Sequence, residues 1–272
     1  MSIADHWQVS RGRIRWLVCA VGLLVVGLLA LAVSPVWGTV LTGPGFNADV
    51  SATVTPDRLP QHGSAPVSLA IKGSITPTSN ALPSASDTLD VNLDRQLAVR
   101  SAGVPVCTLQ RLHAEKLQAG NLHGLEIYTP HNMRTLCGDA LVGHGAVRFT
   151  IPTDQNPIQV RTAVYLFNAH IRGSSARVLV YQEGFWNDAL EWRDVALAQG
   201  GTHGVQILFG GGYKSASSFE FHFGKTWMHK GRRIGYLSGR CVTGTLSSHV
   251  VLTLLNGEKQ SGAISQRCTR GS

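Results

Sequence analysis

The stretch Phe219-Glu220-Phe221-His222-Phe223 alternates three phenylalanines with two polar residues. Successive side chains of a β-strand point to opposite faces of its sheet, so this alternation predicts a strand with one buried and one exposed face. Residues 89–94 and 147–151 alternate in the same way. The three segments together predict a fold built from sheets that each have one apolar face.

Further short runs rich in β-branched and aromatic residues predict more strands, at residues 67–71, 159–167, 177–181, 205–209 and 250–255. The last run leads into Asn256-Gly257, a dipeptide typical of a type I′ hairpin turn. About ten short strands separated by Gly- or Pro-marked turns predict an all-β fold, an antiparallel β-sandwich or a related barrel.

Helix is expected to be scarce. Charged residues make up only 15% of the chain, against about a quarter in an average globular protein, while Gly, Ser, Thr and Val are plentiful. One short helix is predicted where Leu109, Leu112 and Leu117 share a face, and a second over residues 131–137. The sequence therefore predicts one or two short helices beside the sheets.

The amino terminus carries Arg11, Arg13 and Arg15, followed by an apolar run over residues 16–33 without any charge. About 18 apolar residues can span a bilayer, and positive charge before such a run holds the amino terminus in the cytoplasm. We therefore expect a cytoplasmic basic N-terminus (1–15), a transmembrane anchor or signal segment (16–37), a linker (38–48) and an extracytoplasmic domain (49–272).

The sequence leaves open whether this segment is retained. Trp16 and Trp37 bracket the run, and a helix would place them about 30 Å apart, at the two membrane interfaces, as in a single-pass anchor. Val36 and Gly38 occupy plausible −3 and −1 positions for a signal peptidase, and cleavage before Thr39 would give a secreted protein. In either case the rest of the chain lies outside the cytoplasm.

Four cysteines follow the apolar run, and they allow three pairings. The sequential pairing, Cys107 with Cys137 and Cys241 with Cys268, is the economical one. Each bridge would close a loop of about 30 residues and stabilise the domain by about 3.5 kcal/mol on the chain-entropy model. No two of these cysteines have the close spacing of zinc ligands, so disulfides are the expected chemistry.

Several short motifs of this chain share a layout with other proteins. They are Gly103-Val104-Pro105-Val106-Cys107, Cys137-Gly138-Asp139-Ala140-Leu141-Val142-Gly143-His144-Gly145, Phe167-Asn168, and Cys241 and Cys268 with Asn256-Gly257 between them. In this layout the chain resembles a group of uncharacterised exported proteins from actinobacteria and their relatives, although Ala169 replaces the usual glycine after Phe-Asn. The resemblance implies an exported, disulfide-bearing, β-rich domain and carries over no activity or catalytic residue.

One segment is rich in basic and aromatic residues and holds no acid. Its members are Lys225, Trp227, Lys230, Arg232, Arg233, Tyr236 and Arg240, with His229 among them. In a chain of net charge +8, such a patch outside a cell would attract an anionic cell-wall polymer or lipid headgroups. The alternative is a solvated strand-turn-strand face with no ligand.

An enzymatic alternative would use the carboxylates of residues 183–194. Glu183, Asp188, Glu191 and Asp194 lie there beside Trp186 and Trp192. Paired carboxylates suit glycoside cleavage, in which one serves as acid and the other as nucleophile or base. Neighbouring acids on a solvated turn are the commoner case.

No nucleotide, cofactor or metal site is expected. Residues 223–226 end like a nucleotide-binding loop, but Phe219 stands where the first glycine of that motif is required. No two of His113, His123, His131 and His144 have the i, i+4 spacing of a chelating pair. The sequence thus predicts an exported or membrane-anchored structural or binding module at the cell surface, with a secreted glycoside hydrolase as the alternative.

Overall fold

The computed structural model describes residues 38–43, 45–78, 86–108, 137–151, 156–169, 177–186, 189–201, 203–209 and 215–271. All of them belong to one compact unit, Trp37–Ser272. The expected membrane or signal segment and the helix expected around Leu109, Leu112 and Leu117 lie outside the described residues, as does nearly all of the helix expected over 131–137. Within the described ranges, no helix is both long and apolar enough to cross a membrane.

The described chain is built from strands. In chain order they are β1 (Gly38–Gly43), β2 (Phe46–Thr55), β3 (Arg58–Pro60), β4 (Ala65–Pro77), β5 (Ser86–Asn92), β6 (Leu97–Val99), β7 (Leu141–Ile151), β8 (Ile158–Asn168), β9 (Arg177–Trp186), β10 (Ala189–Gly201), β11 (Gly204–Leu208), β12 (Ser215–Phe223), β13 (Thr226–His229), β14 (Arg232–Gly235), β15 (Leu237–Gly239), β16 (Thr245–Leu254), β17 (Lys259–Arg267) and β18 (Thr269–Gly271). A short 3-10 turn, η1 (Gly138–Ala140), precedes β7. The predicted all-β class is confirmed.

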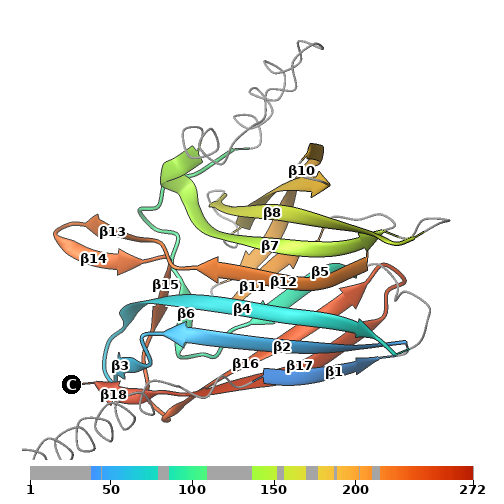
Figure 1. The fold of residues 1–272 in the computed structure, drawn as a ribbon. Helices are drawn as coiled ribbons and strands as arrows, with labels where there is room; N and C mark the ends of the chain where they lie inside the picture. The colour runs from blue at the N-terminus through green and yellow to red at the C-terminus, as the bar shows by residue number, and fades with distance from the viewer. Residues whose placement is uncertain are drawn as a thin grey trace, which may run out of the picture. The chain divides into compact units, whose positions relative to one another are not determined.

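Most strands join one sheet in the order β1-β2-β4-β12-β7-β8-β9-β10-β11-β5-β16-β17, with β15 and β6 added at β4. Every pair in this sheet is antiparallel, and the short β3–β18 pair is parallel. In Figure 1, β5, β16 and β17 lie behind β2, β4 and β12 and run obliquely to them. The prediction of a linker over 38–48 is wrong, because β1 and the start of β2 lie in this range and pair with each other.

The last strand of this order, β17, is linked to the second strand, β2, through a side chain. The Gln266 amide of β17 donates to the Val54 carbonyl of β2 at 2.9 Å and accepts from the Val54 backbone N–H at 2.6 Å. Val54 lies beyond the part of β2 that β1 covers. The glutamine therefore satisfies backbone groups that would otherwise lack a ladder partner.

The main core lies between the front and rear strands. The alternating phenylalanines of β12 are buried in it, with Phe221 and Phe223 fully so, and Phe209 packs its ring against Phe219 and Phe221. A second buried cluster surrounds the Cys107–Cys137 disulfide and includes Phe167. Cys241 and Cys268 form the other disulfide, so the predicted sequential pairing is confirmed.

Of the two hairpin turns near the carboxyl terminus, the one with a predicted type differs from expectation. The predicted β16–β17 hairpin is present, but its turn is not type I′: only Gly257 has a positive φ (84°), and its N–H donates to the Leu254 carbonyl at 2.9 Å. This is a longer loop of the kind in which a glycine follows a type I turn. The type I′ pattern occurs instead at Lys230 and Gly231, which join β13 to β14 with φ values of 48° and 73°.

Candidate functional site

The β13–β14 hairpin projects from the body of the unit (Figure 1). Four residue pairs hold it, from Thr226 opposite Gly235 to His229 opposite Arg232. At its root, the Tyr236 N–H donates to the Lys225 carbonyl at 2.9 Å. The two-residue turn fixes the register, so the basic residues of the segment are presented on a defined scaffold.

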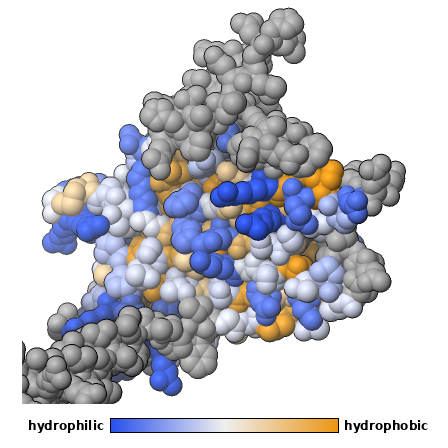
Figure 2. Space-filling view, in the orientation of Figure 1, coloured by the Kyte–Doolittle hydropathy of each residue, from blue (hydrophilic) through white to orange (hydrophobic). Residues whose placement is uncertain are grey.

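The tip of the hairpin is exposed and basic. Lys230, Arg232 and Arg233 are exposed, as is His229, and Met228 has 66% of its surface open to solvent. Arg233 donates to the Thr226 hydroxyl, which is neutral. Within the described ranges, Lys230, Arg232 and Arg233 form no ion pair. Figure 2 shows the hairpin as a mostly hydrophilic projection with a paler apolar area. Among the residues that the structure describes, the positive charge of the tip therefore has no compensating acid.

The other members of the predicted basic segment lie elsewhere. Tyr236 is fully buried in the main core, and this burial raises the pKa of its hydroxyl. Trp227 is half-buried and packs against the same core. Arg240 follows the far end of β15, next to Cys241, and Lys225 lies at the hairpin root. The exposed basic surface, which we call the hairpin tip, thus consists of residues 228–233.

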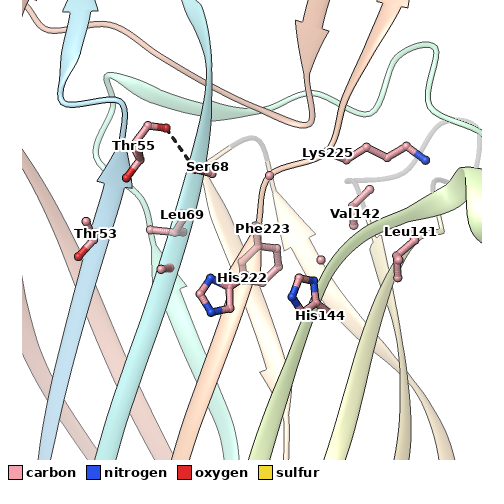
Figure 3. Close-up of a pocket in the computed structure, with 13 residues that line it drawn as sticks. Thr53, Thr55, Ser68, Leu69, Leu141, Val142, His144, His222, Phe223 and Lys225 are labelled. Carbon is pink, nitrogen blue, oxygen red and sulfur yellow. Dashed lines mark hydrogen bonds between the residues drawn. The ribbon is translucent and has the colours of Figure 1, made fainter. Parts of the chain in front are cut away.

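A pocket of about 530 Å³ opens on the outer face of β2, β4, β12 and β7 (Figure 3). Backbone register sets Thr53, Ala70, His222 and His144 opposite one another on these four strands. The two imidazoles stack, with ring centroids 5.5 Å apart and planes 24° apart. Sequence reasoning missed this pair because 78 positions separate its members, and only the β7–β12 register brings them together.

The floor of the pocket is backbone, because small residues line it. Gly143 of β7 and Gly224 at the end of β12 both contribute, beside Ala70. A Cβ added at Gly143 would lie 2.6 Å from the His222 carbonyl oxygen, and one at Gly224 would lie 2.8 Å from the Ser68 Cβ. Neither position has room for a side chain. The Cβ at Gly143 would also lie 3.1 Å from the Phe223 ring and 3.2 Å from the Leu166 side chain, both buried in the core, so this glycine permits the close approach of β7 to β12, whereas Gly224 leaves the outer face open beside Ser68.

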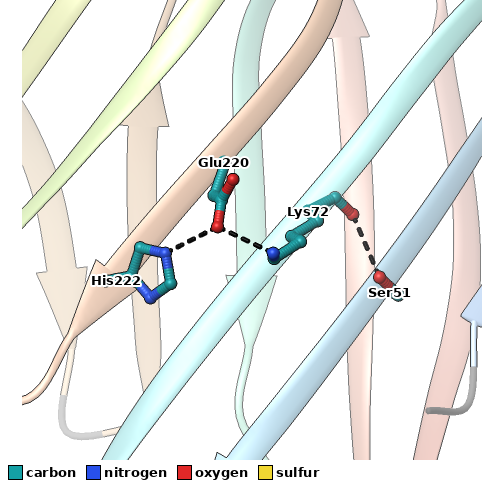
Figure 4. Close-up of polar contacts among 4 residues, drawn as sticks. All are labelled: Ser51, Lys72, Glu220 and His222. Carbon is teal, nitrogen blue, oxygen red and sulfur yellow. Dashed lines mark hydrogen bonds and ion pairs between the residues drawn. The ribbon is translucent and has the colours of Figure 1, made fainter.

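A series of polar contacts holds His222, which lines one wall of the pocket (Figure 4). Glu220 Oε1 contacts Lys72 Nζ at 2.8 Å and His222 Nε2 at 2.7 Å. Hydrogen bonding from Lys72, and then from His222, lowers the pKa of the Glu220 carboxyl. The carboxylate thereby compensates the lysine charge and orients the imidazole of His222.

Lys225 closes the end of the pocket nearest the hairpin. Its ammonium donates to the carbonyls of Gly138, at 3.3 Å, and Asp139, both in η1. Burial lowers the pKa of this lysine, and the nearby Asp139 charge opposes that shift. Like Lys72, the Lys225 ammonium beside the pocket therefore has its hydrogen-bond partners within the protein.

The acidic segment 183–194 falls on the β9–β10 hairpin. Glu183 is fully buried and accepts a hydrogen bond from the Tyr181 hydroxyl at 2.8 Å. The β9–β10 register sets Asp194 opposite Gln182, and Arg193 opposite Glu183. The side chains of Trp186, Glu191, Trp192 and Asp194, and all of Asp188, lie outside the described residues.

Three of the four histidines noted in the sequence, His113, His123 and His131, lie outside the described residues, and the fourth is the pocket residue His144. Among the side chains that the structure describes, no group of three or more His, Cys, Asp or Glu residues could hold a metal ion. Comparison with known protein families, curated proteins and solved structures finds no match to this chain. The geometry of the hairpin tip and the pocket is therefore what bears on function.

Proposed function

We propose that this protein is a binding module of the cell surface, exported and either membrane-anchored or secreted, and that its hairpin tip binds an anionic lipid surface. The observation that carries the proposal is the set of three exposed cations, Lys230, Arg232 and Arg233, without an ion-pair partner in the described structure. Formed disulfides suit an oxidising exterior, and the resemblance to exported proteins agrees with it. We also infer a β-sandwich, since the sheet folds over a single main core.

Lipid is favoured over a soluble anionic polymer because of Met228. This side chain is two-thirds exposed at the tip, next to the cations. A surface that combines basic residues with an exposed apolar side chain suits the headgroup boundary, where the charge meets phosphate and the apolar group enters the acyl region. A polymer in water would gain nothing from the methionine.

The test uses the full chain in a nanodisc of zwitterionic lipid, so that any membrane anchor is already embedded in lipid. It measures retention of this chain on beads coated with a phosphatidylglycerol-containing bilayer. Each Lys or Arg near an anionic surface contributes about 1 kcal/mol, so Arg232→Ala/Arg233→Ala should weaken retention about 30-fold. The matched control is Arg148→Ala/Arg161→Ala, which removes two exposed arginines that face each other on β7 and β8. Equal loss in both variants, or none in either, would overturn the proposal.

The variant Met228→Ser distinguishes binding to an anionic lipid bilayer from binding to a soluble anionic polymer. Burying part of this side chain in lipid is worth about 1 kcal/mol, so retention on the bilayer should fall about fivefold. Retention on an inorganic polyphosphate resin should not change. A chain that binds polyphosphate and ignores the anionic bilayer would show that the ligand is a polymer and that the lipid proposal is wrong.

The alternative, a secreted glycoside hydrolase, has less support. Its first candidate carboxylate, Glu183, is fully buried and bonded to Tyr181, so it cannot act on a substrate without a rearrangement. Release of reducing ends from a glycan that Glu183→Gln abolishes would favour the enzyme over the module.

A further inference from the structure

We infer that the pocket between β2, β4, β12 and β7 is a second binding site, and that it takes an uncharged polyhydroxylated ligand, a saccharide unit. The inference is independent of the lipid proposal, because it rests on different residues. Three properties of the pocket carry it: the compensation of its charges, the chemistry of its walls and the shape of its floor.

The charges beside the pocket are satisfied within the protein. Lys72 is paired with Glu220 at 2.8 Å, and the Lys225 ammonium donates to two carbonyls of η1. Asp139 adds a negative charge near Lys225. A charged ligand would therefore meet no uncompensated opposite charge here, and it would give up its own hydration to enter.

The walls offer both hydrogen-bond donors and hydrogen-bond acceptors. Thr53, Thr55 and Ser68 line one side with hydroxyls, and the Ser68 hydroxyl, which donates to the Thr55 carbonyl at 3.2 Å, can still accept. His144 and His222 line the other with imidazoles, which carry nitrogens that hydrogen-bond and flat ring faces. Sugar hydroxyls need alternating donors and acceptors, while the C–H faces of a sugar ring pack on flat rings. Figure 3 shows the two imidazoles side by side above the strands, across the pocket from the threonines.

The shape also fits a ring that lies flat. The volume of about 530 Å³ falls within the usual 300–1,000 Å³ of small-molecule sites. Gly224 and Ala70 keep long side chains off the floor, so a ligand can approach the backbone closely. The carboxylate of Glu220 holds His222 in place, which reduces the entropy lost when a ligand binds.

The first experiment measures binding of a panel of neutral tetrasaccharides, cellotetraose, maltotetraose and chitotetraose, to the full chain by saturation-transfer NMR and calorimetry. At least one should bind at millimolar concentration. His222→Ala should weaken that binding about tenfold, since it removes a hydrogen-bonding group and a ring face. The control Ser74→Ala, an exposed residue on the same strand as Ala70, should change it less than twofold.

Ala70→Leu is the second variant, and it keeps the inference testable if His222→Ala does not fold. Ala70 is only half-buried and faces the pocket, so the larger side chain fills the hollow and should abolish saccharide binding without touching the core. Three results would overturn the inference: no binding of any tetrasaccharide, binding that survives Ala70→Leu, or a preference for glucose 6-phosphate over glucose. None of these results depends on lipid binding by the hairpin tip, so the two proposals fail separately.

Discussion

The hairpin tip and the pocket are neighbours in the chain, joined at Lys225 and Thr226, yet they treat charge in opposite ways. At the hairpin tip, Lys230, Arg232 and Arg233 face solvent without an acidic partner in the part of the chain that the structure describes. At the pocket, Lys72 meets Glu220 and Lys225 meets the carbonyls of η1. Basic residues that are uncompensated attract an anion over a distance, whereas compensated ones only shape a cavity. A count of basic residues alone would give both regions the same function.

The two regions also differ in how they are built. The hairpin is a separate two-stranded sheet, whereas the pocket lies on the central strands that cover the main core. Damage to the hairpin should therefore be local, and damage to the floor of the pocket should reach the whole unit.

The largest effect is expected from reversing charge at the hairpin tip. Arg232→Glu/Arg233→Glu changes the charge by four units, so retention on the anionic bilayer should fall about a thousandfold at low salt. Saccharide binding should be unchanged, as measured by calorimetry on the same preparation. If the reversal weakened both activities alike, the two regions would not be distinct sites.

The next largest effect tests the close approach of β7 to β12 next to the pocket. A Cβ at Gly145, two residues beyond Gly143, would lie 2.3 Å from the Glu220 carbonyl oxygen and 2.4 Å from the Phe221 ring. Gly145→Val should therefore separate β7 from β12 and lower the free energy of unfolding by about 2–3 kcal/mol in urea denaturation. Wild-type stability in this variant would mean that the close approach of the two strands is unnecessary.

A smaller and local effect is expected at the hairpin turn. Gly231 has a φ of 73°, a conformation that costs a β-branched residue about 1–2 kcal/mol. Gly231→Val should speed amide hydrogen exchange in β13 and β14 and leave the global free energy of unfolding unchanged. A loss of global stability would show that the hairpin is part of the main cooperative unit.

The smallest effect concerns the pH dependence of the Glu220 network. The pKa of this carboxyl lies below its ordinary value of 4.5 because Lys72 and His222 hydrogen-bond to it. A lowered folded-state pKa stabilises the protein above the unfolded pKa, and this stabilisation disappears as the pH falls through the folded value. Since the pair is exposed, the contribution should stay below about 1 kcal/mol.

Glu220→Gln lacks this ionisation and is the matched variant. Urea denaturation should show wild type slightly more stable than Glu220→Gln at neutral pH, with the difference shrinking once the pH drops below 4.5. A difference that grows on acidification would reverse the assigned sign.

Much of the fold could be predicted because alternation commits a strand to one buried face. Residues 219–223 and 147–151 fall on β12 and β7, and residues 89–92 fall on β5. Their apolar residues are buried, except Ile151, which is half-buried. The disulfide pairing could be predicted because the sequential pairing is the most economical of the three that four cysteines allow. Strand β1, in contrast, has a sequence of small and apolar residues without strict alternation, and such a sequence predicts a linker instead of a strand.

The candidate site was less predictable, because its chemistry depends on partners distant in sequence. The basic segment indicated the hairpin tip, but nothing local showed that Tyr236 is buried or that Lys225 binds η1. The Asn256-Gly257 dipeptide suggested a type I′ turn, yet Lys230 and Gly231 adopt that pattern instead. Such choices follow from strand twist and register, which neighbouring strands impose.

The most direct test of the charge comparison is a salt titration of both ligands on the full chain in a zwitterionic nanodisc. At about 0.1 M salt the screening length is near 10 Å, and at 1 M it is near 3 Å. Retention on the anionic bilayer should fall steeply over this range, while affinity for the neutral tetrasaccharide should stay constant. Equal salt dependence of the two would contradict the assignment of uncompensated charge to the hairpin tip and compensated charge to the pocket.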